Sequence, residues 1–103
     1  MSGPVASEDL EAIVKRRTRE LREQRVRYSE AVTLLADELY QNERGKETRI
    51  GQLGASPGLL GPRLGLADSD LSLVAKTKKG KAKALSSIER LVSPWMADVF
   101  EDG

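Results

Sequence analysis

Residues 7–43 read SEDLEAIVKRRTRELREQRVRYSEAVTLLADELYQNE, and no glycine or proline interrupts them. Ser7 can cap the start of a helix, and acidic residues follow it in what would be the first turn. Apolar side chains then recur every three, four or seven residues and share one helical face. These are Leu10, Ile13, Val14, Leu21, Tyr28, Ala31, Val32, Leu35 and Leu39. The stretch predicts one long helix over about 8–43, or two helices joined near Tyr28-Ser29.

A heptad repeat runs along part of this face. The alternate seam positions of the repeat, Thr18 and Arg25, are polar, so the coiled-coil pattern is incomplete. The face therefore predicts either a homodimer through the long helix or docking within one chain. The residues spaced by seven are Val14, Leu21, Tyr28 and Leu35.

Basic residues are concentrated in two blocks, although the formal net charge of the chain is only +1. Residues 15–27 hold seven basic residues and two acidic ones, and residues 76–83 hold five lysines and no acid. The first 14 residues hold three acids and no base. The whole-chain charge therefore understates the local potential that this surface can carry.

The arginine block has two interpretations. In the first, the pairs Arg16–Glu20, Arg19–Glu23 and Glu23–Arg27 are four residues apart, so they predict a self-neutralising ladder on a solvated helix face.

In the second interpretation the same block binds phosphates. Lys15, Arg19 and Arg22 follow one line along the helix with Arg25 beside it. Cations on one side of a rigid helix can follow a phosphate backbone, to which arginine gives bidentate contacts.

The segment 46–66 combines glycine and proline with leucines that are too apolar for a solvated linker. It predicts short helical turns packed on the core, the first at about 50–54. Ser56 as cap and Pro57 as first helical residue predict a second turn, which Pro62 stops or restarts. Together, residues 46–85 predict a core that resembles a helix-turn-helix followed by a wing.

In residues 71–85, apolar and polar residues alternate on both sides of Gly80, which predicts a β-hairpin. The alanine and lysine content of the segment also suits a helix interrupted at Gly80. With the preceding helices, a hairpin would give the element order of a winged helix, whose lysine-rich wing contacts phosphates. A solvated lysine loop is the alternative. In the would-be recognition helix only Arg63 and Ser56 are polar, so sequence-specific base recognition is not expected.

Residues 86–101 predict short C-terminal helices. Ser86-x-x-Glu89 has the pattern of a capping box, and Ser93-Pro94 has that of a second helix start. The segment either closes the core or docks on a partner protein through Trp95 and Phe100.

Length and composition exclude several classes. A chain of 103 residues fits one small domain, here with a disordered tail at 1–6. Cysteine and histidine are absent, which removes disulfides and the common transition-metal sites, and no catalytic constellation is visible. We therefore expect neither an enzyme nor a cofactor. No membrane span or secretion signal is recognisable, so we expect an intracellular protein.

The sequence thus predicts a mainly α protein and two possible functions. The first is nucleic-acid binding, largely through the backbone of DNA or structured RNA. The residues expected to carry it are Lys15, Arg19, Arg22, Arg25, Arg63, Lys76, Lys78, Lys79, Lys81 and Lys83. The second is that of a helical adaptor or assembly subunit. Its interface residues would be Leu21, Tyr28, Leu35, Trp95 and Phe100.

Overall fold

The computed structural model describes residues 6–64 and 78–101. Its helices are α1 (Ala6–Glu23), α2 (Tyr28–Glu43), α3 (Arg49–Gln52), α4 (Leu60–Leu64) and α6 (Lys78–Glu101). Neither described range contains a β-strand, and the prediction of a mainly α fold is confirmed. Within these ranges, no helix combines the length and apolarity that crossing a bilayer requires.

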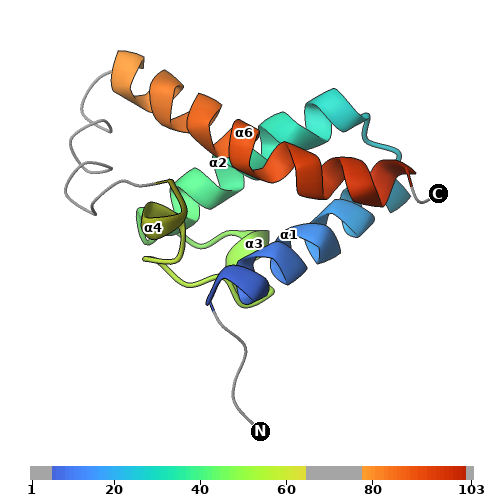
Figure 1. Cartoon of the computed structure of the whole chain (residues 1–103), viewed down its shortest axis with the longest axis horizontal. Helices are drawn as coiled ribbons and strands as arrows, with labels where there is room; N and C mark the ends of the chain where they lie inside the picture. Colours follow the sequence, from blue (N-terminus) through green and yellow to red (C-terminus); the bar gives the residue numbers. More distant parts are fainter. Residues whose placement is uncertain (1–5, 65–77, 102–103) are drawn as a thin grey trace, which may run out of the picture.

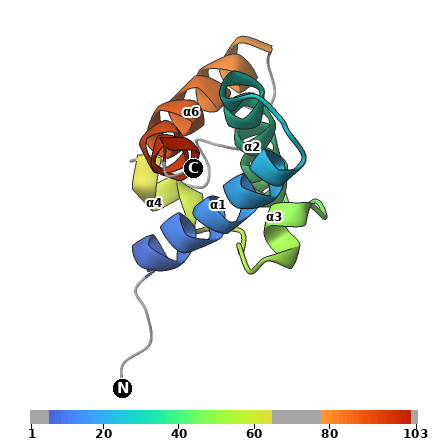
Figure 2. The same cartoon turned by 90° about the vertical axis from the view of Figure 1, so that its right-hand side faces the viewer.

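The three long helices form the body of the molecule (Figures 1 and 2). α6 lies across both α1 and α2, and its C-terminal end reaches the turn that joins those two helices. The short helix α3 packs against α1 and α2, and α4 packs against α6. The last helix in the sequence therefore holds the first two together.

The N-terminal stretch forms two helices, as one of the two predicted alternatives had it. The join is at residues 24–27, slightly before the expected position, and α1 begins one residue ahead of the expected cap, Ser7. Arg25 has a positive φ of 65°. The Val26 amide donates to the Leu21 carbonyl at 3.0 Å, and the Arg25 amide donates to the Arg22 carbonyl at 2.9 Å. These bonds form a Schellman motif, the common helix ending in which a left-handed residue reverses the chain.

Two further helices end in the same way, with glycine at the left-handed position. At the end of α2, Gly45 has a φ of 83° and the Lys46 amide donates to the Gln41 carbonyl at 3.0 Å. Gly54, with a φ of 119°, has the equivalent place after α3. Glycine adopts this conformation without a Cβ clash, whereas the first ending uses an arginine and was therefore not recognisable from the sequence.

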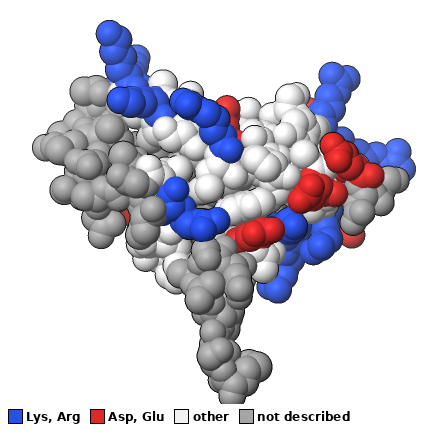
Figure 3. Space-filling view, in the orientation of Figure 1, with Lys and Arg blue, Asp and Glu red and all other residues white. Residues whose placement is uncertain are grey.

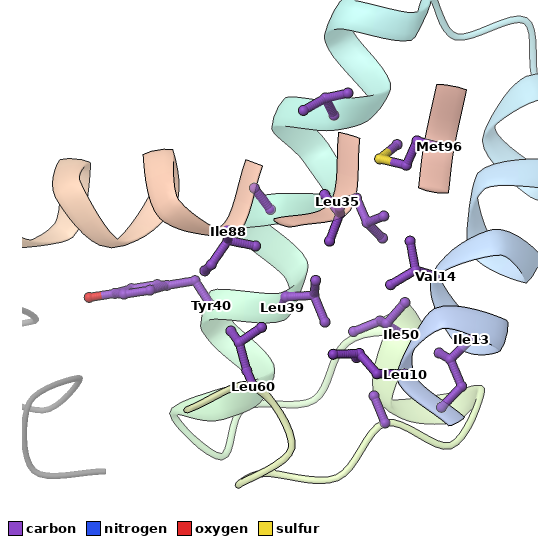
Figure 4. Packing of buried hydrophobic residues seen from close by; sticks show 14 of the residues in the cluster. Leu10, Ile13, Val14, Leu35, Leu39, Tyr40, Ile50, Leu60, Ile88 and Met96 are labelled. Carbon is purple, nitrogen blue, oxygen red and sulfur yellow. The ribbon is translucent and has the colours of Figure 1, made fainter. Parts of the chain in front are cut away.

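The core is built from one apolar face of each long helix (Figure 4). The predicted face of α1 and α2 is buried except for Tyr28, and within it the Thr18 hydroxyl donates to the Val14 carbonyl at 2.6 Å. In α6, buried residues recur every three or four positions over the whole packed length. They are Ala84, Ile88, Val92, Met96 and Val99. This unbroken stripe keeps α6 in one helical register against α1 and α2.

The predicted β-hairpin wing is wrong for the residues described. Residues 78–85 are the first turns of α6, and the helix continues through Gly80 without interruption. Alanine and lysine are strong helix formers, and Ala84 lies four residues before the buried Ile88, so helical packing outweighs the apparent alternation. Residues 71–77, which were expected to form the other strand, lie outside the described residues, as does most of the predicted tail.

The two predicted helix starts in the C-terminal segment are also wrong. Ser86 and Ser93 both lie inside α6, and Pro94 is accommodated within the helix on an exposed position. A proline there cannot donate to the carbonyl four residues earlier, which normally costs stability. Continuous burial of Val92, Met96 and Val99 on the opposite face compensates for that loss.

The glycine- and proline-rich middle segment forms short helices, as predicted. The predicted turn at 50–54 corresponds to α3, where Thr48 caps the helix by accepting from the Gly51 amide at 3.1 Å. The second turn begins at Leu60, later than expected, and Pro62 lies within it. The Glu43 carboxylate accepts from the Gly58 amide at 2.9 Å, which ties this segment to the end of α2.

Candidate nucleic-acid interface

Five cations gather at the start of α6. Lys78, Lys79, Lys81 and Lys83 are exposed on its first turns, and Arg44, also exposed, joins them from the end of α2. We call these five residues the lysine cluster. Among the described residues, none of the five forms an ion pair with a carboxylate. The positive charge of the cluster is therefore not neutralised locally.

Tyr40 connects the two elements of the lysine cluster. Lys81 Nζ lies 5.7 Å from the centroid of the Tyr40 ring, and Arg44 Cζ lies 5.9 Å from it, so both cations lie within cation–π range. Tyr40 itself is only 2% exposed, and its hydroxyl has no hydrogen-bond partner within the described part of the chain. Arg44 was not predicted as a site residue, although its position four residues after Tyr40 on one helix places the two side chains together.

The charge pattern of α6 is opposite to the usual arrangement in a helix. Lysines occupy its N-terminal turns, where the helix dipole is already positive, and no acidic residue lies in the first turn. The exposed Asp98 and Glu101 lie near its C-terminal end, where the dipole is negative. The lysines and the dipole therefore add to one electropositive end, at the expense of helix stability.

Two of the predicted arginine-block cations take part in packing instead. Lys15 pairs with Glu11 at 3.1 Å and with Asp98 at 3.7 Å. Arg22 donates from Nη1 to the Val99 carbonyl at 3.2 Å, where it satisfies a carbonyl in the last turn of α6. The contacts of Lys15 with Asp98 and of Arg22 with Val99 attach α1 to the end of α6. Arg19 and Arg25 are exposed and have no such contact among the described residues.

The predicted self-neutralising ladder is not formed. Glu20 is held by Arg49, whose Nε donates to Glu20 Oε1 at 3.0 Å, and by Arg17, whose Nη1 lies 3.0 Å from the same oxygen. Arg17 also bonds Glu38 on α2 through two nitrogens, at 2.9 and 2.7 Å. The hydrogen bonds from Arg49, supported by those from Arg17, lower the pKa of Glu20 against a partial opposing effect of desolvation. Arg16 has no ion pair with any described residue.

The remaining predicted contacts are spread over other surfaces. Arg63 of α4 is exposed, and its Cζ lies 5.2 Å from the centroid of the Trp95 ring on α6. Lys76 lies outside the described residues. Because a helix rises about 1.5 Å per residue, Lys78 and Val99 are separated by roughly 30 Å. The lysine cluster and the arginine block are thus at opposite ends of α6, and Figure 3 shows the basic side chains in separate groups.

The predicted protein-interface residues divide into two sets. Leu21 and Leu35 are 2% and 0% exposed, so they are core residues of this chain. Tyr28 is 39% exposed, and Trp95 and Phe100 are half-buried. The seam predicted for a homodimer is therefore occupied largely by contacts within the chain.

Comparison with known proteins adds no functional information. The chain matches no protein-family model, no curated protein and no solved structure. A functional inference therefore depends on the geometry and charge of the residues described above.

Proposed function

We propose that this protein binds nucleic acid by contacting the phosphate backbone with the lysine cluster. The observation that carries the proposal is the gathering of five exposed cations, without acidic partners among the described residues, at the positive end of a 24-residue helix. Cations that neutralise phosphates release condensed counterions, which supplies most of the free energy of sequence-independent binding. The cluster surrounds one end of α6: Lys81 lies next to Arg44 at the Tyr40 ring, and Lys83 points to the opposite side of the helix.

The types of side chain favour backbone contacts over base recognition. The exposed residues at the start of α6 are lysines, Ala82 and Ser86. Lysine binds phosphate as a point charge, whereas discrimination between bases usually needs bidentate Arg, Asn or Gln. We therefore expect little sequence preference.

The adaptor alternative has weaker support. Two of the five residues proposed for it lie in the core, and the large apolar side chains that are well exposed in the described residues are only Tyr28 and Leu34. A protein-docking surface normally presents a contiguous apolar patch. The half-buried Trp95 and Phe100 remain the best candidates for such a surface.

The test is a binding titration against duplex DNA, single-stranded DNA and structured RNA at several salt concentrations. A variant in which Lys78, Lys79 and Lys83 are all changed to Gln is compared with the wild-type protein. We expect weaker binding and a salt dependence that is less steep by about 2 to 3 in the slope of log K against log salt, because each phosphate contact contributes about 0.9 on duplex DNA.

A matched control removes the same number of exposed charges from the other end of the molecule. Arg16, Arg19 and Arg27 are exposed and have no ion pairs among the described residues, so the triple change to Gln alters net charge equally. We expect this control to lose much less affinity than the lysine variant. Equal losses in the two variants, or no binding of the wild-type protein at low salt, would contradict the proposal.

A further inference from the structure

A groove lies between α2 and α6, on the side of α6 that carries Lys83. It has a volume of about 390 Å³ and is lined by Tyr28, Val32, Ser86, Glu89, Arg90 and Ser93. The groove is shallow and open to solvent, and its lining combines an aromatic ring, an aliphatic side chain and polar groups. The groove is thus of a size and composition suited to one flat, polar ring.

Tyr28 is held in a defined position at this groove. Its hydroxyl donates to the Ser93 carbonyl at 3.1 Å, and its ring meets Phe100 edge-on, with centroids 5.5 Å apart and an interplanar angle of 76°. The residue nevertheless remains 39% exposed. An aromatic ring that is fixed at two points and still accessible is prepared to stack on another ring with little loss of entropy.

The groove continues the basic surface of α6. Lys83, Ser86 and Arg90 are exposed and follow one another at intervals of three and four residues, so they lie along one line of the helix. Arg90 has no ion pair among the described residues. A strand whose phosphates follow Lys83 and Arg90 would therefore pass the groove.

We propose that this groove binds an unpaired nucleobase, stacked on Tyr28, while Arg90 contacts the adjoining phosphate. Glu89, Ser86 and Ser93 offer oxygen atoms that can accept hydrogen bonds from the amino groups of a base edge. Base stacking on an aromatic side chain is open only to bases that have left a duplex. The inference depends on the proposed function and makes it more specific: the preferred ligand is single-stranded nucleic acid, or a loop.

The experiment compares Tyr28→Leu with the wild-type protein in binding to a mixed-sequence single-stranded oligonucleotide and to its duplex. Stacking is not an ionic contact, so we expect Tyr28→Leu to lose about 5- to 100-fold in single-strand affinity with an unchanged salt slope. Duplex affinity should be unchanged. Tyr28→Phe, which keeps the ring, should retain most of the single-strand affinity.

Two further variants complete the comparison: Leu34→Ala is a control for misfolding, and Arg90→Gln tests the proposed phosphate contact. Leu34→Ala truncates the other large apolar side chain that is exposed on α2, and it should bind both ligands normally. Arg90→Gln leaves the ring in place, and it should weaken single-strand binding with a less steep salt slope. Circular dichroism of each variant confirms that it is folded.

The outcomes separate this inference from the proposed function. If Tyr28→Leu and Arg90→Gln bind single strands as tightly as the wild-type protein, the groove inference is wrong, while the lysine variant can still show backbone binding. The groove inference would also be wrong if Tyr28→Leu lost as much affinity for the duplex as for the single strand. If the wild-type protein binds no nucleic acid, both proposals fail.

Discussion

At the scale of single residues, Arg25 is the clearest departure from local preference. It ends α1 in the left-handed conformation that Gly45 and Gly54 adopt after α2 and α3. In this conformation a residue with a Cβ is less stable than glycine by about 1–2 kcal/mol. Replacing it by glycine recovers only part of that energy, because glycine also makes the unfolded chain more flexible.

We predict that Arg25→Gly raises the free energy of unfolding by about 0.5–1 kcal/mol, since it removes this backbone strain. Urea denaturation measures the change. Arg25→Gln removes the same charge but keeps the Cβ, so it should give no such gain. If the two variants were stabilised equally, the cause would be charge and not backbone conformation.

Glu20 gives a prediction about pH. Hydrogen bonds from Arg49 and Arg17 lower its pKa in the folded chain, so the folded state binds fewer protons at this site than the unfolded state. The stabilising contribution is therefore complete above the ordinary glutamate pKa of about 4.3, and it is lost as the pH falls through the lowered folded-state value.

We expect Glu20→Gln to be less stable than the wild-type protein at neutral pH and the difference to shrink as the pH falls toward 3, below the unfolded-state pKa. Urea denaturation at a series of pH values tests this. Glu30→Gln is the control, because Glu30 is exposed and has no ion pair among the described residues. If the difference in unfolding free energy between Glu20→Gln and the wild-type protein stayed constant down to the lowest pH, the lowered pKa of Glu20 would be contradicted.

At the scale of elements, α6 combines good helix formers with unfavourable end charges. We predict that the double change of Lys78 and Lys79 to Glu stabilises the protein by about 0.3–1 kcal/mol per site, because acidic residues suit a helix N-terminus. Thermal unfolding followed by circular dichroism measures the gain, and nucleic-acid binding should fall in the same variant. Lys83→Glu, beyond the first turn, should gain much less. A gain at Lys83 as large as at the first two positions would point to relief of general repulsion instead.

The elements that were predictable from the sequence are those with an unambiguous period. The apolar face from Leu10 to Leu39 indicated both helices and most of their buried residues. The break at Arg25 was obscured because no glycine marks it. The start of α6 was misassigned because lysine and alanine alternate there, and only the contact of Ala84 and Ile88 with the core decides in favour of a helix.

The candidate site was predictable in part, because the charge of a side chain is visible in the sequence and its partner is not. The exposed lysines of α6 stand out as a block of like charge. Nothing in the sequence distinguishes Arg22, which bonds the Val99 carbonyl, from the exposed Arg19. The meeting of Arg44 with Lys81 at Tyr40, and the presence of Tyr28 and Arg90 in one groove, depend on how α2 packs against α6.

At the scale of the whole molecule, the core is shared among helices that are distant in sequence. Leu35 is fully buried at its centre, whereas its neighbour Leu34 is 45% exposed. We predict that Leu35→Ala lowers the free energy of unfolding by about 2–5 kcal/mol, with Leu34→Ala close to wild type. Urea denaturation at two protein concentrations provides the measurement. A loss for Leu35→Ala that grew at the higher concentration, together with a wild-type stability that rose with concentration, would place this residue in a seam between two chains.

The position of α6 across α1 and α2 also determines when the protein can fold during its synthesis. α6 covers much of the apolar faces of α1 and α2, and its first buried residue, Ala84, lies 41 positions after the end of α2. At about 5–20 residues per second, the ribosome needs roughly 3–12 s to pass from the end of α2 to the end of α6. Until α6 is synthesised, the part of the helix pair that it covers in the native structure has no partner, so the native core is completed only at the end of synthesis.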